Sequence, residues 1–295
     1  MINKPGRAVL IAGLAVIAGS ALWLALNAAG EIRYTADHSG TRPMWHIWIP
    51  ILAGLALARL TPAPPPPAAG LPVKRGLRLQ AGVLLAAAVL FAVALRLVTA
   101  GGHNPEPAHT LLKLLLLVAL PLLLFRLSRA DSADRKPVVV RDRAPALLRL
   151  APVLPVAAWF VLAHFGPFAR PYGDWTAGLD LVTILITMIT VFAVNALLEE
   201  VFYRRWLQTR WERLIGPWPA IVLAGLAFAA WHVGIQGSGG GSGPGHLGAD
   251  LASAFVNQGV LGLFLGYLWT RYRLMWPILT VHGAINAAPA LLALL

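Results

Sequence analysis

Long apolar runs separated by short polar connectors dominate the sequence. Nine candidate spans can be drawn, each near the roughly 20 residues that an α-helix needs to cross a bilayer. They cover residues 8–29, 44–60, 80–99, 109–127, 146–165, 178–198, 218–236, 250–270 and 274–294. The second run is short and contains His46, so eight or nine helices are expected. The pattern predicts an all-α, polytopic transmembrane helix bundle with no sheet.

Basic residues are concentrated in every second connector. They follow the second, fourth, sixth and eighth spans, as Lys74, Arg75 and Arg78, then seven residues from Arg126 to Arg149, then Arg204, Arg205, Arg210 and Arg213, then Arg271 and Arg273. Cytoplasmic loops of membrane proteins carry such an excess of lysine and arginine. We therefore expect a cytoplasmic N-terminus and a C-terminus on the opposite side. The first run follows Lys4 and Arg7 and is interpreted as a retained signal anchor.

Three connectors have a composition typical of linkers. Thr61–Pro72 is rich in proline and alanine and predicts an extended spacer. Gly237–Gly248 is almost entirely glycine and serine, which is typical of a flexible loop. Ser128–Pro145 is polar and charged, and it divides the chain into an N-terminal part, residues 1–145, and a C-terminal helical bundle, residues 146–295.

Composition supports the membrane interpretation and argues against several other kinds of protein and chemistry. The chain is 58% hydrophobic and 12% charged, with a mean hydropathy of +0.70, which leaves no room for a large soluble domain. The net charge of +12 would suit nucleic acid, but the basic residues lie between apolar runs, so the lipid bilayer is the expected partner and nucleic acid is not. Cysteine is absent, which excludes disulfides and thiolate chemistry. The composition and charge pattern favour a bacterial inner membrane.

Two adjacent carboxylates end the sixth apolar run. A charge at membrane depth is costly unless it is paired or takes part in chemistry. Glu200 and Arg204 are four residues apart and can pair on one helical face. Glu199 points about 100° away, on a face shared with Asn195 and Tyr203, where no partner is expected. Taken alone, this stretch favours a simple boundary of a transmembrane helix.

Two later spans contain polar residues at helical spacing. His232 lies inside the seventh span, and His282 and Asn286 are four apart in the ninth. Each histidine alone is typical of helix packing. Together with Glu199, however, they supply a general base for water and donors for an oxyanion, as peptide-bond hydrolysis requires. Gly283 would allow a substrate or a helix to approach closely. Asn257, Gln258 and the remaining histidines are interpreted as packing or span-edge residues.

The spacing of these residues resembles the three motifs of a known family. Glu199-Glu200-x-x-x-Arg204, Phe228-x-x-x-His232 and His282-x-x-x-Asn286 are similar to the motifs of the CPBP family, which comprises the CAAX-prenyl-protease-2-like and bacteriocin-processing (Abi) intramembrane endopeptidases. The resemblance covers about residues 178–292 and implies a membrane-embedded glutamic endopeptidase. It implies that Glu199 activates water with help from His232, that His282 and Asn286 form the oxyanion site, and that Glu200 and Arg204 are supporting residues.

Alternatives remain open at this point. Two histidines and a carboxylate can bind zinc, and Glu199, His232 and His282 would be its ligands, although the helical HExxH signature is absent. A metal-free mechanism without cofactor is favoured. A transporter with a proton relay or a non-proteolytic scaffold would use the same residues differently. For a protease, the expected substrate is a peptide or protein in or at the membrane, such as part of an exported protein.

The drawn spans place two site residues at different depths. Glu199 lies at the end of its span, whereas His232 follows Trp218 by 14 residues, or about 20 Å of helix. A sixth helix that continues to about Trp206 would bring the two residues level.

Overall fold

The computed structural model describes residues 3–33, 40–64, 75–103, 105–128, 146–169, 178–236 and 247–293. Most of each predicted linker, Thr61–Pro72, Ser128–Pro145 and Gly237–Gly248, lies outside these ranges.

Nine helices make up most of the described part of the chain, which confirms the all-α polytopic bundle. Three of them are interrupted by wider π-helical segments, labelled η. The elements are α1 (Lys4–Asn27), α2 (Trp45–Leu60), α3 (Arg75–Ala100), α4 (Pro105–Leu112) with η1 (Lys113–Ala119) and α5 (Leu120–Leu127), α7 (Ala146–Leu150) with α8 (Val153–His164), α9 (Leu181–Val191) with η2 (Phe192–Leu197), α10 (Leu198–Glu200), η3 (Val201–Gln208) and α11 (Thr209–Ile215), α12 (Pro217–Gln236), α13 (Leu247–Ala254) with η5 (Phe255–Gly259) and α14 (Val260–Tyr272), and α15 (Met275–Ala293).

Length and composition make this an integral membrane protein. Seven of the described helices are long and apolar enough to cross a membrane, and α2 is a shorter apolar helix. Large aliphatic side chains on the outer helices face away from the bundle, for example Ile11, Leu26, Leu97 and Leu127. In water such a surface would be unfavourable, whereas lipid chains cover it at no cost.

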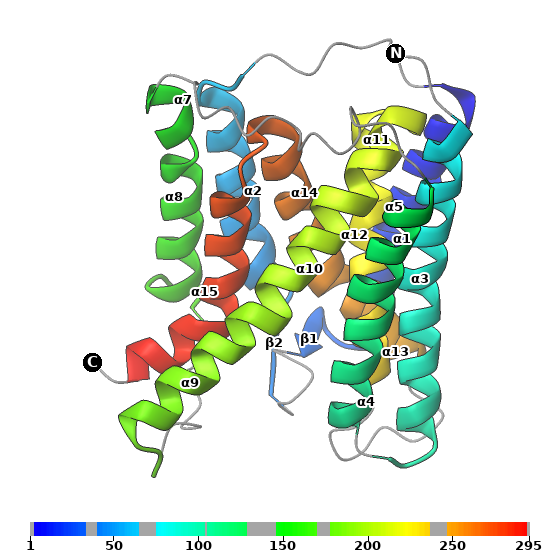
Figure 1. Ribbon diagram of the computed structural model, residues 1–295. Helices are drawn as coiled ribbons and strands as arrows, with labels where there is room; N and C mark the ends of the chain where they lie inside the picture. Colours follow the sequence, from blue (N-terminus) through cyan, green and yellow to red (C-terminus); the bar gives the residue numbers. More distant parts are fainter. Residues whose placement is uncertain are drawn as a thin grey trace.

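Successive helices alternate in direction (Figure 1). α1 begins at the upper end of the view, α4, α9 and α13 begin at the lower end, and α15 runs towards the lower left. The basic connectors therefore meet at one end, because Arg149 lies in α7 and Arg213 lies in α11, both at the top. This arrangement agrees with the alternation of charge in the sequence.

A small β-ribbon corrects the expectation of no sheet. β1 (Glu31–Arg33) pairs antiparallel with β2 (Thr41–Pro43), with Ile32 opposite Arg42. Ile32 is buried under the bundle, and the side-chain amide of Asn257 donates to the carbonyl of Arg33 at 3.1 Å. The ribbon gives hydrogen-bond partners to a connector that enters the protein interior, where unpaired backbone groups are costly.

The sixth helix is much longer than the apolar run predicted. It extends without a break from Leu181 to Ile215 and crosses the bundle diagonally in Figure 1. Glu199 thus lies 16 residues before Ile215, and His232 lies 15 residues after Pro217, so each is roughly 20 Å of helix from the same end of the bundle. The helix continues past Trp206, as expected, and reaches nine residues further, to Ile215.

α12 lies at the centre of the bundle and packs against its neighbours through small residues. A Cβ atom built on Gly262 of α14 would lie 2.8 Å from the Cα of Gly225 in α12. Close backbone approach at glycine is a common way to join helices in membranes. The contact holds α12, which carries His232, firmly in the interior.

Candidate active site

Four full charges and one histidine meet in the interior of the bundle. Lys113, Glu199, Glu200, Arg204 and His282 are each 6% exposed or less. Lys113 lies in the fourth helix and His282 in the last one. Glu199, Glu200 and Arg204 lie in the sixth helix. Since two cations and two anions balance, the group can be buried without a net charge, which is the usual condition for ions inside a membrane protein.

Glu200 uses both carboxylate oxygens within this group. Its Oε2 accepts a hydrogen bond from Nε of Arg204 at 3.1 Å, so the predicted contact between residues four apart is present. Its Oε1 accepts from Nδ1 of His282 at 2.8 Å. The Arg204 guanidinium also lies over the ring of Phe228, 5.2 Å from its centroid. Glu200 therefore joins the sixth helix to the last one and orients an imidazole.

Glu199 has a partner that we did not predict. Nζ of Lys113 donates to Oε1 of Glu199 at 2.6 Å and to Oδ1 of Asn195 at 2.7 Å. The expectation of an unpaired Glu199 is thus wrong, because the counter-charge comes from a span outside the motif region. The other oxygen, Oε2, has no hydrogen-bond partner in the described part of the chain and lies 4.0 Å from Nε2 of His282.

Lys113 was missed because a single lysine near the start of an apolar run resembles a side chain that reaches back to the interface. The available signal was its position inside the predicted span 109–127, where an ammonium group needs a partner. The faces predicted for the sixth helix are confirmed, since Asn195 and Glu199 point to the same cation. Tyr203 is also fully buried.

The hydrogen bonds define the protonation of the two histidines. A carboxylate and a carbonyl can only accept, so His282 donates from Nδ1 to Glu200, and His232 donates from Nδ1 to the carbonyl of Phe228 at 3.0 Å. In each neutral ring, Nε2 then carries no hydrogen. A hydrogen bond from Nε2 of His282 to an oxyanion would require a second proton on that ring.

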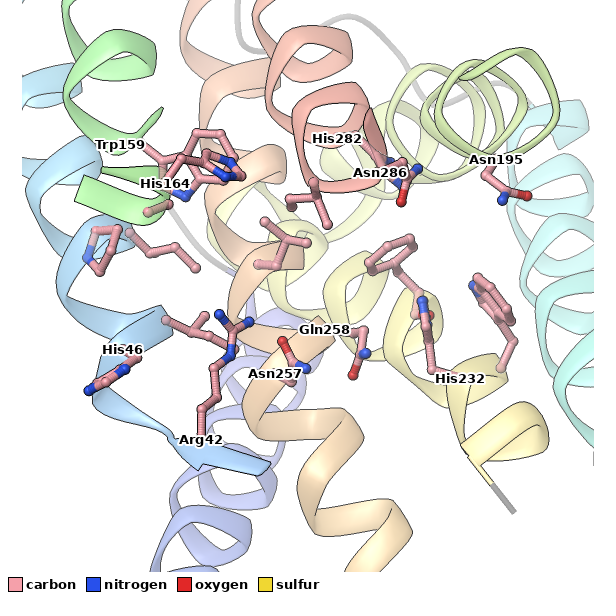
Figure 2. A pocket seen from close by; sticks show the side chains of 18 of the residues that line it. Arg42, His46, Trp159, His164, Asn195, His232, Asn257, Gln258, His282 and Asn286 are labelled. Carbon is pink, nitrogen blue, oxygen red and sulfur yellow. The ribbon is translucent and has the colours of Figure 1, made fainter. Parts of the chain in front are cut away.

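A cavity of about 210 Å³ lies beside the charged group. His232, His282, Asn195 and Asn286 line one side of it, and Figure 2 shows Arg42 and His46 at the opposite side, with Asn257 and Gln258 between. The side-chain Nδ2 of Asn286 has no hydrogen-bond partner among the described residues. This buried amide nitrogen is therefore unsatisfied, although its residue lines the cavity.

Three of the four predicted catalytic side chains therefore line the same cavity. The fourth, Glu199, is 1% exposed and is not a lining residue. It lies behind His282, with its Oε2 directed at the Nε2 that is 4.0 Å away. Gly283 gives the close approach that was expected of it, because a Cβ built there would lie 2.9 Å from the Phe192 ring of the sixth helix.

Several residues interpreted as packing or span-edge residues belong to the cavity. His46, His164, Asn257 and Gln258 all line it, and this placement was not predicted. His109 instead stacks on Trp231, with ring centroids 5.0 Å apart. Trp231 in turn packs on His232, with centroids 3.8 Å apart, so aromatic packing fixes the ring of His232 from behind.

Several polar residues of the site and the cavity lie in π-helical segments. Lys113 starts η1, Asn195 is in η2, Arg204 is in η3, and Asn257 and Gln258 are in η5. The two glutamates occupy the short α10 between η2 and η3. π-Segments are rare and often occur at functional sites, because the wider turn redirects side chains. No residue pattern in the sequence indicated them.

The donor arrangement does not suit a metal ion. Within the described ranges no three histidine, aspartate or glutamate side chains are grouped so that they could hold one. The zinc set considered from the sequence was Glu199, His232 and His282. Here the Lys113 ammonium occupies Oε1 of Glu199. We therefore derive no step through a metal.

Comparison with known proteins gives one match. Residues 181–288 match the family model described as type II CAAX prenyl endopeptidase Rce1-like. This segment contains all three motifs and agrees with the resemblance found from the residues. No curated protein and no solved structure gives a significant match to the chain. Lys113 and Arg42 lie outside the matched segment.

Proposed function

We propose that this chain, a member of the Rce1-like type II CAAX prenyl endopeptidase family through residues 181–288, hydrolyses peptide bonds with a water molecule activated by Glu199. Its apolar helices place the chain in the bilayer, and the family consists of endopeptidases. The proposed substrate is a peptide or protein in or at the membrane, such as an exported protein. The proposed location is a bacterial inner membrane, with the N-terminus in the cytoplasm.

One observation distinguishes the two carboxylates and carries this proposal. Both oxygens of Glu200 are engaged, by Arg204 and by His282. Glu199 keeps Oε2 without a hydrogen-bond partner among the described residues, on the side facing His282. A general base needs a lone pair within reach of the proton that it removes. Of the two carboxylates, Glu199 is the one with an oxygen left without a partner among the described residues, which supports this role for it.

The reaction then follows from the positions of the side chains. Oε2 of Glu199 removes one proton from a water molecule, and the water oxygen bonds to the peptide carbonyl carbon. Nε2 of His232 accepts a hydrogen bond from the second hydrogen of the same water. The amide of Asn286 donates to the oxyanion, and His282 donates beside it when its Nε2 also carries a proton. The carbon–nitrogen bond breaks, and the leaving nitrogen takes the proton from Glu199. Glu200 and Arg204 orient His282 throughout.

A comparison of cells tests this function. Membrane peptides from cells that produce the wild-type protein are compared by mass spectrometry with those from cells that produce Glu199→Gln. The amide keeps the size of the side chain but is no base, so fragments should appear only with the wild type. Thermal unfolding of both purified proteins serves as the control for folding. A folded Glu199→Gln protein that yields the same fragments would refute the role of Glu199.

A further inference from the structure

We propose that Lys113 is a positioning residue that fixes the Glu199 carboxylate and determines which of its oxygens activates water. The fourth helix, which lies outside the matched segment 181–288, would then be part of the catalytic machinery. This inference rests on the proposed function.

Lys113 is fully buried, and its ammonium group contacts three other side chains. The residue is 0% exposed, and Nζ lies 2.6 Å from Oε1 of Glu199 and 2.7 Å from Oδ1 of Asn195. Nζ also lies 5.1 Å from the centroid of the Trp231 ring. An ammonium group has three donors, so two are engaged and the aromatic ring flanks the group. The ammonium is thereby held at a defined point.

The fixed ammonium of Lys113 limits the orientations that the Glu199 carboxylate can adopt. The glutamate side chain has three rotatable bonds, and holding it in one geometry costs conformational entropy. The short contact to Oε1 fixes one end of the carboxylate, and Oε2 is left facing Nε2 of His282 at 4.0 Å. A reacting group supported by a second residue keeps the narrow geometry that catalysis requires. Asn195 contributes by fixing Lys113 rather than Glu199.

Lysine also suits this position better than arginine. An ammonium is a compact charge that can contact one oxygen and leave the other available. A guanidinium has a planar fork of donors that favours both oxygens of a carboxylate at once. If the role of Lys113 were only to neutralise charge, arginine would replace it. If its role is to leave Oε2 open, arginine would preserve the ion pair and hinder the reaction.

The experiment uses the full-length protein and a fluorogenic peptide built on a cleavage site identified in the mass-spectrometric comparison. Wild type, Lys113→Arg, Lys113→Met, Glu199→Gln and the double variant Lys113→Met/Glu199→Gln are purified, and Tm, kcat and KM are measured for each. We expect Lys113→Arg to remain folded with kcat reduced at least tenfold and KM within about twofold. Lys113→Met should lower both Tm and kcat.

The double variant separates positioning from folding. Lys113→Met and Glu199→Gln each leave one buried group without its charged partner, so each should lower Tm, and the double variant should recover most of the loss. Folded Lys113→Arg protein with wild-type kcat would overturn the inference while leaving the proposed function intact, provided that Glu199→Gln is inactive. An active, folded Glu199→Gln protein would instead overturn the proposed function. If Lys113→Arg does not fold, wild-type kcat in the folded fraction of Lys113→Met overturns the inference.

Discussion

His282 donates its Nδ1 hydrogen to Oε1 of Glu200 across 2.8 Å, a contact between the last helix and the sixth. A histidine whose ring N–H donates to a carboxylate is fixed in tautomer and orientation. The consequence is that Nε2 of His282 points to the other carboxylate, Glu199. The two adjacent glutamates thus face different nitrogens of one imidazole, Glu200 at Nδ1 and Glu199 at Nε2.

Loss of Glu200 or Arg204 should affect stability before activity. Glu200→Gln or Arg204→Ala leaves an unpaired charge in the interior, which typically costs about 3–5 kcal/mol. We expect lower yield and a clearly lower Tm in detergent, measured by thermal unfolding. Arg78→Gln, at an exposed position on α3, is the matched control and should change Tm little. A Glu200→Gln protein with normal Tm and no activity would show that the two glutamates have the opposite roles.

His232 and Asn286 should affect the rate instead. His232→Ala removes a hydrogen-bond acceptor for the attacking water, and a fall in kcat of about 10²–10⁴ is expected for such a group. Asn286→Ala removes an oxyanion donor, typically worth about 10²–10³ in kcat. Kinetics with the identified peptide measure both values. Asn27→Ala, at the exposed end of α1, should leave kcat unchanged. A loss of less than threefold for Asn286→Ala would exclude it from the oxyanion site.

Chelators should have little effect on cleavage. The proposed mechanism uses Glu199, His232, His282 and Asn286 without a metal, so 1,10-phenanthroline and EDTA at millimolar concentration should leave kcat within about twofold of its value without chelator. The measurement is the initial rate before and after dialysis, with metal content determined on the same sample. Loss of activity that returns on addition of zinc would favour the metalloprotease alternative.

The alternation of helices predicts the sides on which the connectors lie. α5 ends at the upper end of the bundle and α12 ends at the lower end. Reporter fusions after Arg143 and after Gly243 should therefore report opposite compartments, and the fusion after Arg143 should be cytoplasmic by the excess of basic residues. Signals from the same compartment at both positions would contradict the topology.

Much of the fold could be predicted from sequence because hydrophobic runs depend only on local composition. The nine helices agree with the nine apolar runs to within a few residues at most ends. The pairing of Glu200 with Arg204 was also predictable, since spacing within one helix determines it. The β-ribbon was not, because its short strands depend on contacts with Asn257, more than 200 residues away.

The site was only partly predictable for the same physical reason. The three motifs identified His232, His282 and Asn286, and these residues line one cavity. The pairing of Lys113 with Glu199 depends on how two separate helices pack, and the sequence does not contain that distance. The π-segments depend on small changes in backbone hydrogen bonding, to which hydrophobic periodicity is insensitive.

The ion pair between Lys113 and Glu199 also has a consequence for biosynthesis. The two residues are 86 positions apart, so at about 5–20 residues per second Glu199 is made roughly 4–17 s after Lys113. During this interval the fourth helix carries a charge without its counter-ion, which costs about 2.5–3.5 kcal/mol at the centre of a bilayer. We expect this helix to remain beside the insertion machinery, or to lie higher in the membrane, until the sixth helix arrives. Assembly of the bundle would then be the event that brings Lys113 to its final depth.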